Sequence, residues 1–311
     1  MNAQIKDRKY LVTGASGYVG GRLVRNLLNE NLSVRVMVRD RAKIKGQPWF
    51  DHVEIVEGNA NSESDLIEAL TGIHTAYYLL HSINLGKNFD DIEAVMARGF
   101  AKAAEAAGVS QIIYLGGIAN DKKSSQHLAS RVQTGAELAS GKVPVLELRA
   151  GIIIGSGSAS FEMLRHLTHR LPVMTTPKWV SNLTHPIAIR DVLYYLRSTA
   201  FLEVPVNKVF DIGGPEILSY ADMMQKFAKL SGLPRRWIIK VPVLTPELSS
   251  LWIGLVTPVP TALARPLVGS LINEVVADPK KSINGLIPLP PEGLLNVESA
   301  ITLALSRTSD G

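Results

Sequence analysis

The sequence predicts an α/β fold in which a doubly wound parallel sheet is followed by a smaller, mostly helical C-terminal lobe. Three observations predict it. Short apolar runs alternate with helical patterns over the first half of the chain, as in parallel sheets that helices cover on both faces. A glycine-rich turn joins the first apolar run to the first helical pattern. After Arg149 the alternation loosens, and prolines become frequent from Leu233 onward.

The first half of the chain supplies the strands and helices of the predicted sheet. The strand-like apolar runs are short and bounded by turn residues. They are Tyr10–Thr13, Val34–Val38, Val53–Val56, Ala76–Leu80, Gln111–Leu115 and Val145–Leu148. Between them, apolar residues recur at the spacing of an amphipathic helix. These segments are Val19–Asn29, Ser64–Leu70, Phe89–Ala107 and His127–Ala139.

The second half keeps helical patterns but loses the regular strands. The helices predicted there are Phe161–Arg170, Asp191–Phe201 and Ser219–Leu230, and Lys208–Ile212 is a late strand. We therefore predict residues 1–155 as one domain to which 184–216 return, with 156–183 and 217–311 forming the smaller lobe.

Composition narrows the classes of function. The chain has no cysteine, which excludes disulfides, thiolate catalysis and iron–sulfur clusters. Its net charge is +5 at pH 7, but the basic residues are scattered apart from a cluster between Arg35 and Lys45, so we expect no nucleic-acid partner. His166 and His169 have no carboxylate at ligand spacing, so no metal site is predicted.

The sequence shows no pattern that predicts a secretory signal or a membrane-spanning helix. The residues before the first strand lack the apolar core of a secretory signal, and the lack of cysteine fits a cytoplasmic protein. The longest uncharged apolar stretch, Leu248–Ala264, is shorter than a membrane-spanning helix and contains Pro258 and Pro260. We expect it to pack within the lobe, with contact of 248–272 to a membrane surface or a partner as the alternative.

The glycine-rich turn is the strongest functional signal. Lys9–Gly21 reads KYLVTGASGYVGG, with its glycine triplet between a strand and a helix. Such glycines allow a tight turn, close approach of the backbone to phosphate and close packing of the helix on the strand. The helix N-terminus presents free N–H groups to an anion. We predict a Rossmann-type dinucleotide site with contacts from Gly14, Ser16, Gly17, Tyr18, Val19 and Gly20.

The end of the second strand predicts which dinucleotide binds. NAD sites usually carry an acidic residue there for the ribose 2′-hydroxyl, whereas NADP sites place an arginine nearby for the 2′-phosphate. Val34–Val38 is followed by Arg39, which could stack on adenine and pair with the phosphate. Asp40 is one position late and should point elsewhere. The predicted cofactor is NADP, with NAD as the alternative.

Six segments, taken in order, resemble the atypical extended short-chain dehydrogenase/reductases, which include NmrA-like and epimerase-dehydratase-like proteins. The segments are Val12–Gly20, Val56–Ala60, Ile112–Gly117, Leu148–Gly155, Thr184–Val192 and Phe210–Pro215. The resemblance implies that Asn59, with Ala60 beside it, lies at the adenine. It also implies that Leu80 and His81 lie against the ribose and pyrophosphate.

The resemblance locates the catalytic positions, and the sequence departs from the family there. The family uses a Ser, a Tyr and a Lys four residues after the Tyr. The corresponding positions here hold Gly117, His127 and Arg131. Arg131 keeps a positive charge for ribose or phosphate but cannot relay protons at ordinary pH. His127 and His81 are the candidate acid–base groups, each with an ordinary structural role as the alternative, and Arg131 should lower the pKa of His127.

The expected substrate residues are mostly apolar. They lie on segments that the family uses to line its pocket, although packing within the lobe explains each of them equally well. They are Gly117, Phe161, Met163, Met174, Trp179 and His185.

Three functions remain open from the sequence. The first is an NADP-dependent oxidoreductase of non-standard mechanism acting on an apolar carbonyl or quinone substrate. The second is a regulatory protein that senses NADP(H) and binds a protein partner without catalysis. A nucleotide-sugar epimerase or dehydratase is a weaker third hypothesis, because that chemistry depends on the missing Tyr-Lys pair. The oligomeric state is open.

Overall fold

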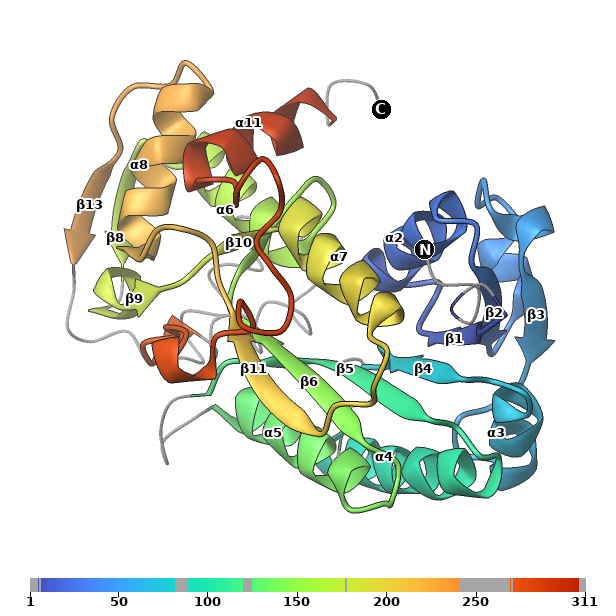
Figure 1. Ribbon diagram of the computed structural model, residues 1–311. Helices are drawn as coiled ribbons and strands as arrows, with labels where there is room; N and C mark the ends of the chain where they lie inside the picture. The colour runs from blue at the N-terminus through green and yellow to red at the C-terminus, as the bar shows by residue number, and fades with distance from the viewer. Residues whose placement is uncertain are drawn as a thin grey trace.

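A computed structural model describes residues 7–81, 89–119, 125–176, 178–240 and 271–307, together with Ile5 and Gly269. Seven parallel strands form one sheet in the order β11-β6-β5-β4-β1-β2-β3 (Figure 1). Their bounds are β1 Lys9–Thr13, β2 Ser33–Val38, β3 Glu54–Glu57, β4 Thr75–Tyr78, β5 Gln111–Gly117, β6 Val145–Ala150 and β11 Lys208–Ile212. The predicted doubly wound parallel sheet is confirmed.

Helices cover both faces of this sheet (Figure 1). One face carries α3 (Glu63–Leu70), α4 (Phe89–Ala106) and α5 (Gln126–Ala139), and the other carries α2 (Tyr18–Asn29) and α7 (Ile189–Ser198). Successive residues of a strand point to opposite faces. In β1, accordingly, Leu11 joins the core under α3–α5, whereas Tyr10 and Val12 join the core under α2 and α7.

The smaller lobe packs around its own apolar core. Helices α6 (Ala159–Arg170), α8 (Tyr220–Leu230) and α11 (Val297–Ser306) enclose it. Short strand pairs join it: β7 (Ile153–Ile154) with β10 (Ile187–Ala188), β8 (Val173–Thr176) with β13 (Trp237–Lys240), and β9 (Leu183–Thr184) with β12 (Leu218–Ser219). Single turns of 3₁₀ helix lie at Arg41–Ile44, Phe50–His52, Lys178–Ser181, Thr199–Phe201 and Pro279–Lys281.

The smaller lobe contains elements that the sequence did not predict. The strand pair β8–β13 and helix α11 were not predicted, although Asn296 caps α11 by accepting from the Ser299 N–H at 2.8 Å. The segment Leu248–Ala264 lies outside the described residues. Among the helices that the structure describes, none has the length and apolarity needed to cross a bilayer.

Candidate cofactor and substrate site

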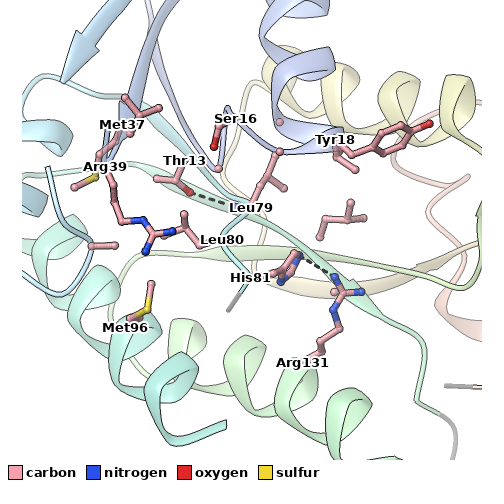
Figure 2. A pocket seen from close by; sticks show the side chains of 18 of the residues that line it. Thr13, Ser16, Tyr18, Met37, Arg39, Leu79, Leu80, His81, Met96 and Arg131 are labelled. Carbon is pink, nitrogen blue, oxygen red and sulfur yellow. Dashed lines mark hydrogen bonds between the residues drawn. The ribbon is translucent and has the colours of Figure 1, made fainter. Parts of the chain in front are cut away.

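A cavity of about 400 Å³ lies at the carboxyl ends of the central strands, where the strand order reverses between β1 and β4 (Figure 2). This switch point is where open parallel sheets bind their ligands. All the residues expected at the cofactor line it: Gly14, Ser16, Gly17, Tyr18, Val19, Gly20, Arg39, Asn59, Ala60, Leu80, His81 and Arg131. Sequence reasoning missed further wall residues, among them Thr13, Met37 and Met96.

The glycine turn has no room for side chains. Gly14 has φ +67°, and a Cβ there would lie 2.4 Å from the Leu79 carbonyl oxygen. A Cβ on Gly20 would lie 2.2 Å from the Gly14 carbonyl oxygen. Gly17 begins helix α2 without any side-chain cap, so the first N–H groups of the helix are left for a ligand. The turn therefore fits a pyrophosphate.

Thr13 fixes the two strands that flank the switch point. Its hydroxyl donates to the Tyr77 carbonyl oxygen at 2.9 Å and accepts from the Leu79 N–H at 3.1 Å (Figure 2). These bonds clip the end of β1 to the end of β4. They hold the cavity floor in place before any ligand binds.

Arg39 lies in the cavity wall just after the end of β2. Its side chain is exposed and extends into the same region of the cavity as Leu80 and Met96 (Figure 2). Arg39 takes part in none of the ion pairs found among the described residues. Its guanidinium is therefore available to a phosphate.

Two neighbours of Arg39 have structural roles instead. The Asp40 carboxylate accepts from the Ala42 N–H at 2.9 Å and so caps the following 3₁₀ turn. Arg35, which belonged to the expected basic cluster, is buried. It donates to the Ala69 and Thr71 carbonyl oxygens at the end of α3 and pairs with Glu54 at 2.7 Å. It neutralises the C-terminal end of a helix rather than offering charge to a ligand.

The Asn59 side chain is partly committed to its own loop. Its Oδ1 accepts from the Asn61 N–H at 3.0 Å, and its backbone N–H donates to Asp65 at 2.8 Å. Asn59 lies in the cavity wall with this loop geometry fixed.

The candidate catalytic residues form one group. Arg131 donates to His81 Nε2 at 2.8 Å, so this nitrogen of His81 is an acceptor (Figure 2). His81 is exposed to the cavity, yet its pKa is well below the usual value, first because of lost solvation and then because of Arg131 and His127. Burial, followed by the charge of Arg131, lowers the pKa of His127 to about 3. Both imidazoles are therefore neutral near pH 7.

Gly117 makes room for Arg131. A Cβ at Gly117 would lie 3.0 Å from Leu128 Cδ2 and 3.3 Å from Arg131 Cδ. A serine at this position would crowd the arginine side chain. Glycine at this position therefore leaves space for the side chains of Leu128 and Arg131.

The depressed pKa of His127 predicts a loss of stability in acid. The unfolded chain takes up a proton as the pH falls below about 6.5, whereas the folded chain resists protonation of His127 until about pH 3. The free energy of unfolding should therefore fall by about 1.4 kcal/mol per pH unit through this window. Urea unfolding of wild type and His127→Gln across the window checks this. A variant with the same pH dependence as wild type would contradict it.

The expected substrate residues separate into two groups. Gly117 and Met163 line a second cavity of about 90 Å³, together with His127, Leu128 and others. Phe161 packs edge-on against Phe227 with ring centroids 5.9 Å apart, and Trp179 packs on Tyr220 at 5.8 Å.

The remaining two expected residues, Met174 and His185, make structural contacts instead. Met174 is buried in the lobe core. His185 Nε2 donates to the Gly214 carbonyl oxygen at 2.6 Å. Four of the expected substrate residues therefore lie outside the walls of both cavities in the described part of the chain: Phe161, Met174, Trp179 and His185.

The two cavities meet. Arg131, Ala150 and Gly151 line both of them. Sequence reasoning missed three polar residues of the smaller cavity, Ser160, Thr184 and Tyr220. The last two are buried. Thr184 lies within a motif segment and Tyr220 lies at the predicted start of α8, so their positions were visible, but their burial was not.

The switch-point cavity, the glycine turn and the uncapped helix define an NAD(P)H-binding protein with a Rossmann-type fold. Residues 14–140 match the family model described as NAD(P)H-binding. The structure of Citrobacter sp. triphenylmethane reductase complexed with NADP(H) is similar to 95% of this chain and 99% of that chain, with a TM-score of 0.73 and 19% identity. Residues 14–140 thus form an NAD(P)H-binding domain, and the likeness to the solved structure shows the shared fold.

Two curated relatives extend the comparison. The chain is 27% identical over 240 residues to ceramide reductase of Caulobacter vibrioides. The aligned region covers 74% of this chain and 73% of the relative. The chain is 26% identical over 250 residues to the photosystem II assembly factor Ycf39 of Cyanophora paradoxa, with 77% and 73% covered. The relatives thus include a named reductase and a named assembly factor.

Proposed function

We propose that the protein is an NADP(H)-dependent reductase that acts on an apolar carbonyl or quinone compound without the family's Tyr-Lys pair. The observation that carries this proposal is the junction of the two cavities at Arg131, Ala150 and Gly151. A protein that only senses a dinucleotide needs no second cavity beside it. When bound, NADPH supplies the hydride.

Arg131 is the residue with the central role in this proposal. It lines both cavities, it is held by His81, and its Nε is buried with no partner in the described part of the chain. A fixed positive charge at this junction stabilises negative charge that develops on a substrate oxygen. Because His81 and His127 are neutral near pH 7, we assign them to orienting Arg131 and shaping the cavity rather than to storing a proton. The proton that completes the reduction of the substrate oxygen then comes from solvent water.

The cofactor choice follows from Arg39, which lies exposed at the adenine end without an ion-pair partner in the described residues. The names of triphenylmethane reductase and ceramide reductase support a reductase with an apolar substrate. The same names leave the substrate of this chain open. A cytoplasmic location and the division at residue 155 also stay predictions.

A regulatory protein without catalysis is the second candidate. The replacement of the family's Ser, Tyr and Lys favours it, and so does the likeness to an assembly factor. Under this alternative the chain binds NADPH and a protein partner and consumes no cofactor. The Tyr-Lys pair on which epimerases depend is replaced by His127 and Arg131, which leaves that third hypothesis weakest.

Consumption of NADPH with a panel of quinones, ketones and aldehydes tests the proposal. We expect steady turnover with at least one apolar member, followed through NADPH absorbance, and a reduced product identified by mass spectrometry. NADPH binding without turnover across the panel, with a protein that co-purifies, would support the regulatory alternative instead.

Arg131→Met should lower kcat/KM by about 100-fold, because the charge that stabilises the substrate oxygen is lost. Arg131→Lys should retain part of the activity, since it keeps a charge but loses the fork geometry. Arg98→Met is a matched control, because Arg98 pairs with Glu137 on the outer helices at 2.7 Å, away from both cavities. Equal losses in the Arg98 and Arg131 variants would contradict the assignment.

A further inference from the structure

The small cavity contains two hydroxyl groups that find no hydrogen-bond partner among the described residues. Tyr220 is 1% exposed and Thr184 is 2% exposed, and both line the cavity. Within the described part of the chain, neither the Tyr220 hydroxyl nor Thr184 Oγ1 has a hydrogen-bond partner. Burying a hydroxyl without a partner costs free energy, so nearly all buried hydroxyls in folded proteins are paired.

Three other buried tyrosines of this chain follow that rule. The Tyr10 hydroxyl donates to the Ala200 carbonyl oxygen at 2.9 Å. The Tyr77 hydroxyl donates to the Leu196 carbonyl oxygen at 3.1 Å, and the Tyr114 hydroxyl donates to that of Arg131 at 3.1 Å. Tyr220 differs from these three tyrosines in facing a cavity, which indicates that its partner is a ligand.

The local structure fixes both hydroxyl-bearing residues. Thr184 ends β9 and pairs in register with Leu218 of β12, two residues before Tyr220. Tyr220 begins α8, where Ser219 and Asp222 form a capping box. Neighbouring strands therefore hold the two residues in one unit, and neither depends on a loose loop for its position.

Apart from His127, Arg131 and Ser160, the rest of the small cavity wall is apolar. Leu128, Ile152, Met163, Leu271 and Val275 belong to it. A volume of about 90 Å³ holds only a few non-hydrogen atoms, so one end of a larger ligand can enter while the remainder lies toward the junction at Arg131. Two hydroxyl donors within an apolar wall are complementary to a ligand end that carries an oxygen acceptor and no charge.

We propose that Tyr220 and Thr184 bind the carbonyl or quinone oxygen of the substrate, so that the small cavity is the site for the oxygen-bearing end of an apolar molecule. This inference rests on the proposed reductase function. Both hydroxyls donate hydrogen bonds to this oxygen. The Arg131 guanidinium, which lines the same cavity, stabilises the negative charge that develops on it. Burial raises the pKa of Tyr220 above its usual value, so the phenol stays protonated and acts as a hydrogen-bond donor.

The first test measures stability, because an unpaired hydroxyl is a liability in the ligand-free protein. Tyr220→Phe and Thr184→Val should each raise the melting temperature by about 2 °C. Tyr77→Phe and Thr168→Val are matched controls whose hydroxyls are bonded, the latter to the Leu164 carbonyl oxygen at 2.8 Å, and they should lower it. A decrease for Tyr220→Phe equal to that of Tyr77→Phe would show that an ordered water pairs the hydroxyl and would overturn the proposal.

The second test measures ligand binding to the NADP⁺-loaded protein by titration calorimetry. Naphthoquinone and naphthalene are the probes, since they share a ring system and differ in the oxygens. The chain has no cysteine for the quinone to alkylate. Either variant should weaken naphthoquinone binding about tenfold and leave naphthalene binding unchanged. Unchanged naphthoquinone binding in both variants, or no binding by wild type, overturns the proposal.

The binding test separates this inference from the reductase proposal. Naphthoquinone binding that depends on Tyr220, in a protein that never consumes NADPH, would refute the reductase and leave the oxygen site standing. NADPH consumption with the same kcat and KM in wild type and Tyr220→Phe would refute the oxygen site and leave the reductase proposal standing.

Discussion

Gly20→Ala is expected to abolish measurable NADPH binding and to destabilise the fold by about 3 kcal/mol. The added Cβ would lie 2.2 Å from the Gly14 carbonyl oxygen and 2.7 Å from the Gly14 carbonyl carbon. Both are backbone atoms, so the phosphate turn itself must shift and the N–H groups of α2 lose their alignment. Fluorescence titration with NADPH and urea unfolding measure the two effects.

Gly99→Ala is the matched control for this substitution. Gly99 lies within α4, and a Cβ there would meet Leu66 Cδ1 at 3.9 Å, which is ordinary contact. Alanine favours the helix by about 1 kcal/mol over glycine, so this variant should be more stable and bind NADPH as wild type does. Wild-type NADPH affinity in Gly20→Ala would contradict the assignment of the turn to phosphate.

Arg39→Gln should weaken NADPH binding by about 50-fold while changing NADH binding little. A charge-assisted hydrogen bond to the 2′-phosphate is stronger than one between neutral groups, and NADH lacks that phosphate. The ratio of the two dissociation constants, measured at one salt concentration, reports the effect directly. Salt should weaken NADPH binding to wild type more than to the variant.

Arg41→Gln is the control for Arg39→Gln. The Arg41 guanidinium lies over the Phe50 ring, 5.1 Å from its centroid, and Arg41 is not part of the cavity wall. The Arg41→Gln substitution removes one positive charge from the same region of the surface as Arg39→Gln does. An equal loss of NADPH preference in both variants would mean that general charge, rather than Arg39, selects the cofactor.

The sheet was predictable because its signals are local. Strand β1, the glycine turn and α2 carry periodicity and backbone requirements within one short segment, and the repeated alternation fixes a parallel arrangement. Strands β8 and β13 were not predictable in the same way. They pair across some sixty residues of sequence, Val173 with Trp237, and neither segment alternates strongly enough to specify a strand.

The cofactor cavity was predictable from local sequence signals, whereas the small cavity was not. The cofactor wall follows from a motif whose residues lie close in sequence. Arg35 shows the limit of such reasoning, because only the tertiary contact with α3 reveals that its charge is already used. Tyr220 and Thr184 could not be selected from sequence. They combine a place in the cavity wall with a buried hydroxyl that has no partner among the described residues, and burial depends on long-range packing of the lobe.

Transfer of deuterium from NADPH labelled at C4 of the nicotinamide tests the central claim most directly. The product of an apolar aldehyde or ketone that the protein consumes would be analysed by mass spectrometry. The reductase account predicts one deuterium at the former carbonyl carbon, from one face of the nicotinamide. Stoichiometric binding of labelled NADPH, with no labelled product from any carbonyl compound and no reduction of any quinone, would contradict it.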